Sequence, residues 1–469
     1  MKMNKVFMCL GVLTCLVFVS SDLSAQSENG QATRSGKLHE LSEKLKQRDL
    51  ADKSRARSAA QKMGIASRRE LPNGRILELQ RIVPGIGPIF YVTNNVDAAD
   101  TVSTDEVWPG GSAGLDLDGS GMNLGEWDGG AVFDQHPDFA GRLTQADGAT
   151  TVSNHSTHVA GTLVGSGEWL LPESRGMAYE AHLDAYDWNS DTAEMAAAAA
   201  NGLLLSNHSY GIAAGWLYTG ALLPPDTWWW IGGPDPADVE DPNFGYYDSE
   251  TQLWDQIAHD APYYLIVKAA GNDRSDIGPA AGEVYTVIDQ DGNFLFTSDL
   301  PRNADCAPAG YDCVPGSGVA KNVLTVGAVD DLIGGYSKFS GPSSVQMAGF
   351  SGWGPTDDGR IKPDLVGNGI FLLSAWGDDP YYAAAAGTSM ATPHVAGVAA
   401  LIRAVSPTVP VSQMKNIIMV SADDIPSMDG ITVSGGRLNA FFAIAEPDDV
   451  PPDAIVDLAA GTPTSNGMG

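Results

Sequence analysis

Short apolar strands alternate with helical segments from about residue 100 to residue 445 of this 469-residue chain. The pattern predicts strands at 124–127, 203–205 and 264–267, and helices at 191–200 and 253–259. Parallel strands need a crossover connection between them, and a helix is its usual form. We therefore expect a doubly wound α/β domain over residues 96–445, with a mostly parallel sheet and helices on both faces.

The N-terminal residues 1–25 have the composition of a signal peptide. Lys2 and Lys5 precede an uncharged apolar run over 6–19, and residues 23–25 offer a small-residue cleavage site. The run is shorter than the roughly 20 apolar residues of a membrane span. We expect export, to the extracellular space, the periplasm or the cell surface, with no stable membrane insertion after cleavage. An uncleaved N-terminal anchor is the alternative.

Residues 26–95 differ from the rest of the chain in charge. They contain 13 Lys/Arg and 7 Asp/Glu, a net charge of +6, whereas the chain after residue 95 carries −38. Leucines at helical spacing predict a helix over 37–62, and strand-like runs follow at 75–82 and 88–92. We interpret this small α+β unit as a pro-segment; a permanent N-terminal subdomain is the alternative.

The acidic character of the chain excludes some partners and favours others. A net charge of −31 repels the phosphates of nucleic acid and of anionic lipids. The same charge attracts neutral or basic peptides. We therefore expect polypeptide partners and no nucleic-acid partner.

Four cysteines are present, and two of them lie in the predicted signal peptide. The other two, Cys306 and Cys313, are close in sequence, and in an exported protein such a pair is expected to form a disulfide. Two free thiols are the alternative. No further Cys or His near them completes a zinc site.

Four polar residues stand in glycine-rich surroundings that suit hydrolytic chemistry. Asp128 ends a predicted strand before two glycines, and Asn272 follows Gly271 after another strand. His155 begins His-Ser-Thr-His, and Ser389 stands in Gly-Thr-Ser-Met-Ala-Thr-Pro-His-Val-Ala-Gly. Ser389 precedes an apolar helical stretch, so the helix N-terminus can stabilise an oxyanion there. A serine needs a base, which His155 can be if Asp128 orients it.

These segments, in the chain order Asp, His, Ser, resemble the subtilisin-like serine proteases, or subtilases, over about residues 100–445. The resemblance implies a secreted serine endopeptidase that works through an acyl-enzyme. Ser389 would be the nucleophile, His155 the general base and acid, and Asp128 the residue that orients His155. Asn272 and the Ser389 backbone N–H would form the oxyanion hole.

The resemblance also implies where a substrate binds. The segment Asn-His-Ser-Tyr-Gly resembles the edge strand that pairs with substrate backbone, and its last three residues are Ser209, Tyr210 and Gly211. Ala270, Gly271 and Asp273 would line the pocket for the side chain before the scissile bond, where Asp273 could accept a basic group. No cofactor is needed for this chemistry, and a structural calcium ion is compatible with the family, without assigned ligands. The pro-segment would act as an intramolecular chaperone and inhibitor.

The chain departs from the family pattern at two places near the site. Ser156 follows the catalytic histidine where the family usually has glycine, and Gly129-Gly130 replaces the usual Thr-Gly or Ser-Gly after Asp128. A Trp- and Pro-rich insertion over 216–247 lies beyond the substrate strand. Because none of these changes removes a catalytic group, we expect the chain to have peptidase activity.

Three other interpretations of the sequence are open. The first is an α/β-hydrolase, because Gly110 to Gly114 fits its Gly-x-Ser-x-Gly motif, but the flanking strand and helix are missing and we expect a loop there. Asp128, His155 and His158 could bind a metal, although His-x-x-His lacks the spacing of the zinc helix. A catalytically inactive subtilase fold used for binding is the third. Two acidic loops, at 116–119 and 289–292, resemble partial calcium loops without the closing Glu.

The C-terminal residues change composition again. Residues 446–453 are rich in Pro and Asp and predict a linker. Residues 454–469 resemble the start of a fibronectin type III-like module that is cut short.

Overall fold

The structure is a computed structural model. It describes residues 34–48, 50–62, 67–70, 76–83, 87–93, 102–169, 171–218, 228–233, 240–288, 294–298, 302, 306, 311–330, 345–377 and 381–445. The predicted signal peptide, linker and C-terminal module lie outside the described residues, as does the acidic loop at 289–292.

A nine-stranded sheet forms the centre of the molecule, in the order β18-β19-β15-β14-β11-β7-β4-β6-β5. Its pairs are parallel except β18 with β19. The strands are β4 (Asn123–Asp128), β5 (Leu143–Gln145), β6 (His182–Asp187), β7 (Leu205–His208), β11 (Leu265–Ala269), β14 (Leu324–Val329), β15 (Leu365–Asn368), β18 (Asp423–Asp424) and β19 (Gly436–Arg437). The predicted mostly parallel sheet is confirmed.

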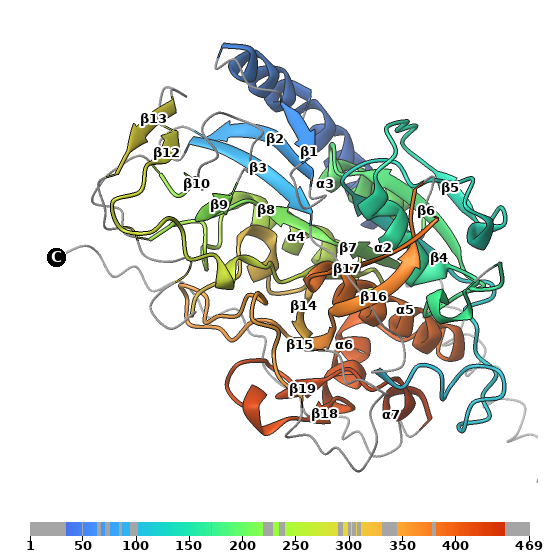
Figure 1. Cartoon of the computed structure of the whole chain (residues 1–469). Coiled ribbons are helices and arrows are strands. Elements are labelled where there is room, and N and C mark those ends of the chain that lie inside the picture. The colour runs from blue at the N-terminus through green and yellow to red at the C-terminus, as the bar shows by residue number, and fades with distance from the viewer. Residues whose placement is uncertain are drawn as a thin grey trace, which may run out of the picture.

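Helices cover both faces of this sheet (Figure 1). They are α2 (Asn154–Val164), α3 (Asp191–Ala200), α4 (Ser249–Asp260), α5 (Thr388–Val405), α6 (Val411–Val420) and α7 (Ala440–Ala445). Neighbouring side chains of a strand point to opposite faces. On β4, Leu124 packs in a cluster with residues of α2 and α5, whereas Trp127 packs with residues of α3 and α4. The face of α2 and α5 is thus distinct from the face of α3 and α4.

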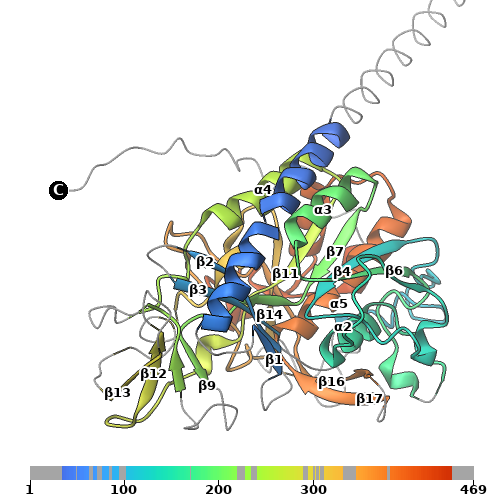
Figure 2. The same ribbon diagram turned by 90° about the horizontal axis from the view of Figure 1, so that it is seen from above.

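The N-terminal unit lies on the second face. Residues 34–48 and 50–62 are helical, and this helix runs against α3 and α4 in both views (Figures 1 and 2). The Ser42 hydroxyl donates to the backbone oxygen of Ala193 at 2.6 Å, and Leu38 is buried among residues of α3 and α4. The strands β1 (Arg68–Glu70), β2 (Ile76–Val83) and β3 (Gly87–Thr93) follow, and β3 pairs antiparallel with β8 (Tyr210–Ile212).

The Trp-rich insertion contributes to a separate sheet in the order β13-β12-β10-β9. Its strands are β9 (Trp216–Tyr218), β10 (Trp228–Trp230), β12 (Tyr285–Ile288) and β13 (Phe294–Thr297). A hairpin of β16 (Ile370–Ala375) and β17 (Tyr382–Ala386) leads directly into α5. Short 3-10 helices lie at Pro137–Phe139, Pro172–Ser174, Asp273–Ser275, Gly316–Val319 and Pro426–Met428.

Two local expectations differ from the structure. Strand β7 begins at Leu205, because Gly202 adopts φ +98° and residues 203–204 then link α3 to the sheet. The run Asp191-Thr192-Ala193-Glu194, with an acidic residue three positions on, predicts Asp191 as the N-cap of α3, but Asp191 is its first helical residue and Ser190 is the cap. The Asp191 carboxylate instead accepts the hydroxyl of Tyr210 at 2.7 Å. In the part of the chain that the structure describes, none of the helices combines the length and the apolar composition that a membrane span requires.

Candidate active site

The predicted catalytic residues gather at one edge of the sheet. Asp128 is the last residue of β4, Ser209 follows β7 directly, and Asn272 lies three residues past the end of β11. Because these strands are parallel, their carboxyl ends meet at the same edge. Helices α2 and α5 begin there as well, with His155 and Ser389 each as second residue.

Asp128 and His155 form a buried pair. The Nδ1 atom of His155 lies 2.6 Å from Oδ1 of Asp128, and the two side chains are 1% and 0% exposed. A carboxylate at Nδ1 accepts the N–H there, which leaves Nε2 as the atom able to take a proton. The cap of α2 fixes this geometry, because the hydroxyl oxygen of Ser153 accepts the backbone N–H of Ser156 at 3.1 Å.

Ser156 contacts the catalytic aspartate, which the sequence did not predict. Its hydroxyl donates to Oδ1 of Asp128 at 3.1 Å, and the backbone N–H of Gly129 donates to the same oxygen at 2.5 Å. The serine that replaces the usual glycine is therefore a partner of Asp128 as well as a small residue.

Ser389 is held at the start of α5 by reciprocal contacts with Ser209. The Ser389 hydroxyl donates to the backbone oxygen of Ser209 at 2.5 Å. The Ser209 hydroxyl donates to the backbone oxygen of Ser389 at 2.6 Å. Both residues are fully buried. These contacts join the nucleophile candidate to the first residue of the predicted substrate strand.

Asn272 is oriented by the residue next to Ser389. Its Oδ1 accepts the backbone N–H of Thr388 at 2.9 Å and the Thr388 hydroxyl at 2.8 Å. With the oxygen engaged in this way, the amide N–H₂ is the end that can bind a substrate oxygen. Gly271 has φ +98°, and a Cβ there would approach Pro315 to 2.8 Å, so only glycine fits before Asn272.

The two other histidines near the site have structural contacts. His158 is fully buried, its Nε2 lies 3.0 Å from the backbone oxygen of Leu372, and burial lowers its pKa to about 3. His394 is buried on α5 with Nδ1 2.6 Å from the backbone oxygen of Met390. Both rings are thus bonded to backbone oxygens inside the core, which fits a packing role better than proton transfer.

The substrate-binding residues predicted from the sequence surround the same edge. In β8, Tyr210 and Gly211 pair with residues 93 and 92 of β3. Ala270 and Gly271 connect β11 to Asn272 and are buried. Asp273 is also buried, at 5% exposure, so it lies deeper than an exposed rim residue would.

The predicted disulfide is present, and it lies close to this wall of the site. Cys306 and Cys313 are bonded, with Cα atoms 5.0 Å apart. Pro315, two residues further on, contacts the Gly271 position. Among the described residues no group of three or more His, Cys, Asp or Glu side chains gathers as a metal site.

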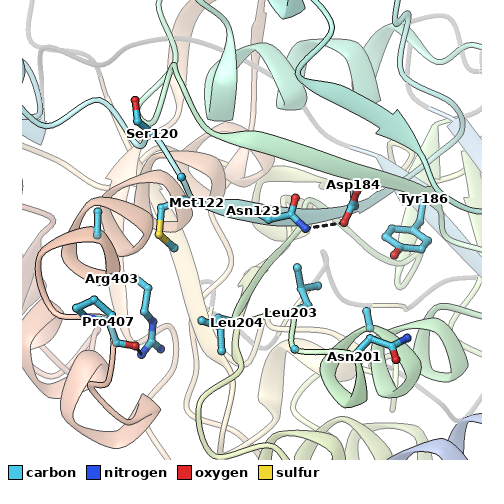
Figure 3. A pocket seen from close by; sticks show the side chains of 14 residues that line it. Ser120, Met122, Asn123, Asp184, Tyr186, Asn201, Leu203, Leu204, Arg403 and Pro407 are labelled. Carbon is cyan, nitrogen blue, oxygen red and sulfur yellow. Dashed lines mark hydrogen bonds between the residues drawn. The ribbon is translucent and has the colours of Figure 1, made fainter.

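A cavity of about 680 Å³ lies elsewhere, at the amino ends of the central strands (Figure 3). Asn123 and Asp184 of β4 and β6 line it together with Leu203, Leu204 and Arg403 near the end of α5. Asp128 lies at the other end of β4, and Ser389 lies at the other end of α5. This cavity is therefore not the catalytic centre.

The sequence model of the subtilase family matches residues 121–449. The chain belongs to the subtilase family. The match includes Asp128, His155, Asn272 and Ser389.

Curated relatives agree with this subtilase assignment over shorter stretches. Serine protease AprX of Bacillus subtilis is 32% identical over 136 residues, which are 26% of this chain and 30% of AprX. Pyrolysin of Pyrococcus furiosus is 28% identical over 282 residues, 53% of this chain and 17% of pyrolysin. The subtilase chain thus spans less than a third of either relative. Among solved structures, fervidolysin from Fervidobacterium pennivorans shares 20% identity and a TM-score of 0.46, over 76% of this chain and 48% of fervidolysin.

Two further polar residues of this subtilase lie under the site and were missed by the sequence reasoning. Glu126 stands two residues before Asp128 on the same face of β4, and Asn207 lies opposite it on β7. The available signal was a charged residue in the middle of a short strand between apolar neighbours, in a strand that is buried after its first residue.

Proposed function

We propose that this protein is a secreted serine endopeptidase that hydrolyses peptide bonds through an acyl-enzyme. The 2.6 Å contact between His155 and Asp128 carries the proposal, because it fixes the tautomer of an imidazole at the sheet edge where α5 begins with Thr388 and Ser389. Family membership supports it.

Each group has one role in the reaction. Rotation about the Cα–Cβ bond of Ser389 moves its hydroxyl from the Ser209 oxygen to Nε2 of His155. His155 takes the proton as Ser389 Oγ attacks the substrate carbonyl, and Asp128 stabilises the imidazolium. The Asn272 amide and the Ser389 N–H bind the oxyanion. His155 then gives its proton to the leaving amine, and water hydrolyses the acyl-enzyme by the same steps.

The experiment compares the wild type with Ser389→Ala. A fluorophosphonate reagent should label the wild type and not the variant, and peptidase activity should fall by about 10⁶-fold. An inactive binding protein of this fold, the alternative, would show neither labelling nor hydrolysis in the wild type. Full activity in purified Ser389→Ala protein would exclude Ser389 as nucleophile.

The N-terminal unit is proposed to be a pro-segment that blocks the site until it is removed. Strand β3 pairs with β8, the strand that would bind substrate backbone. Thr93, the last residue of β3, pairs with Tyr210, and Tyr210 directly follows Ser209, which contacts Ser389. The Arg68 guanidinium also donates to the backbone oxygen of Gly129, next to Asp128. A segment in this place excludes substrate by competition.

N-terminal sequencing of the protein released by cells tests export and processing together. The wild type should begin between Asn94 and Thr104, and Ser389→Ala should retain the segment when no other protease is present. An active protein that still begins at Gln26 would show a permanent subdomain, and a protein that stays inside the cell would refute secretion.

A further inference from the structure

Glu126 is an acidic residue buried beneath the proposed catalytic centre. It is 0% exposed and lies on the β4 face that carries Leu124 and Asp128, under α2 and α5. Neither oxygen of its carboxyl group has a hydrogen-bond partner among the residues that the structure describes. A buried polar group without a partner is rare in folded proteins and calls for an explanation.

Asn207 lies directly opposite Glu126 on the neighbouring strand β7, and its amide has only one possible orientation. The Ser209 hydroxyl has a single hydrogen, which it gives to the backbone oxygen of Ser389. Toward Asn207, 2.9 Å away, Ser209 Oγ can therefore only accept. Asn207 thus turns its N–H₂ to Ser209 and its Oδ1 to the other side.

The Oδ1 atom of Asn207 then has no donor within the described part of the chain, and it is 1% exposed. Glu126 is its neighbour across the strand pair on the same face. Two acceptors side by side repel each other, whereas a protonated carboxyl group supplies the missing hydrogen. Burial and the negative charge of Asp128 raise the pKa of Glu126 well above its ordinary value, which favours the protonated form.

We propose that Glu126 keeps its proton and donates a hydrogen bond to Oδ1 of Asn207, and so acts as a positioning residue for the nucleophile. Asn207 in turn donates to Ser209, and Ser209 holds Ser389 through two contacts. The chain of hydrogen bonds runs from the core of the sheet to the nucleophile and to the start of the substrate strand. The kinetic part of this inference rests on the proposed peptidase function.

The ionisation state of Glu126 also affects the catalytic histidine. On the elements packed around this face, the titratable and charged groups are Asp128 on β4, Asp187 on β6, His155 and His158 on α2, and His394 and Arg403 on α5. The side chains of His182, Asp184 and His208 belong to the other face of the sheet. An ionised Glu126 would add a second negative charge beside Asp128 and would hold a proton on His155 more tightly. A neutral Glu126 adds no charge. Replacing it with another neutral residue should therefore leave unchanged the acid limb of the pH profile, which is the range of low pH over which peptidase activity falls.

The kinetic test compares Glu126→Gln, which keeps a donor, with Glu126→Leu, which removes it at similar size. Active sites are counted with fluorophosphonate, so that unfolded protein does not enter kcat. We expect Glu126→Gln to stay within about threefold of the wild type with the same acid limb. Glu126→Leu should lose about tenfold or more in kcat per active site, with KM changed less than threefold. Thr432→Val, a buried hydroxyl without a described partner far from the site, is the matched control and should change neither.

A spectroscopic test does not depend on activity. In the Ser389→Ala background, infrared difference spectra at neutral pH should show a protonated carboxyl band that disappears with Glu126→Gln. Absence of that band, a shift of the acid limb to lower pH in Glu126→Gln, or equal kcat in the Gln and Leu variants would each overturn the inference. If the Ser389→Ala protein shows the band but the wild type does not hydrolyse peptides, the proposed function is refuted and the proposed hydrogen bond is not.

Discussion

Glu250 at the start of α4 offers a quantitative test of how the N-terminal unit is held. Its carboxylate lies 3.1 Å from Nη2 of Arg48 and 3.8 Å from Nη1 of Arg81, so Glu250→Gln weakens two ion pairs at once. The side chains of Glu250 and Arg48 are 11% and 35% exposed. Partly exposed pairs contribute about 0.2–1 kcal/mol each, and we therefore expect a loss of about 1 kcal/mol in binding. That corresponds to about a fivefold weaker inhibition constant.

The assay measures inhibition of the mature enzyme by a separate peptide of residues 26–95, at salt concentrations of about 0.1 M and 1 M. The effect of Glu250→Gln should shrink at the higher salt, because the Debye length falls from about 10 Å to about 3 Å. Asp260→Asn, at the other end of α4, changes the net charge equally without contacting Arg48 or Arg81 and is the control. Equal weakening by both variants would show that overall charge, and not these pairs, holds the segment.

Three further predictions concern single residues. Asn272→Ala should lower kcat by about 10²–10³-fold with little change in KM, the usual cost of losing one oxyanion donor, and a change in KM alone would refute the role. Thr388→Val removes one of two donors that orient Asn272 and should lower kcat by about tenfold, as measured with active-site titration. Lys268 is buried over the ring of Tyr210, and burial lowers its pKa to about 7. The unfolded chain therefore binds more protons between about pH 7 and 10, and wild-type stability rises with pH over that range. Lys268→Met should raise the unfolding free energy by about 1–4 kcal/mol below pH 7, with the gain closing toward pH 10, as followed by chemical denaturation in the Ser389→Ala background. A gain that is independent of pH would show that Lys268 is not neutral in the folded state.

The fold class and the residues proposed for catalysis could both be predicted from the amino-acid sequence. Alternating strands and helices predict the parallel sheet. Asp128, His155 and Ser389 stand in short motifs that can be recognised in the sequence by their resemblance to those of subtilases. The bonding of Cys306 to Cys313 was also predictable, because the two residues are close in sequence. These inferences succeed because periodicity and motif spacing are local properties.

The residues that support the site from beneath could be identified only from the folded structure. Ser209 and Ser389 are 180 positions apart and exchange two hydrogen bonds, and Glu126 meets Asn207 only because β4 and β7 are neighbours in the sheet. The docking of β3 on β8 depends in the same way on strand order. Side-chain patterns specify that a segment is a strand, but which strands pair is set by the packing of the whole sheet and its helices. Contacts between distant strands, and the protonation that burial imposes on Glu126, therefore emerge only in the folded chain.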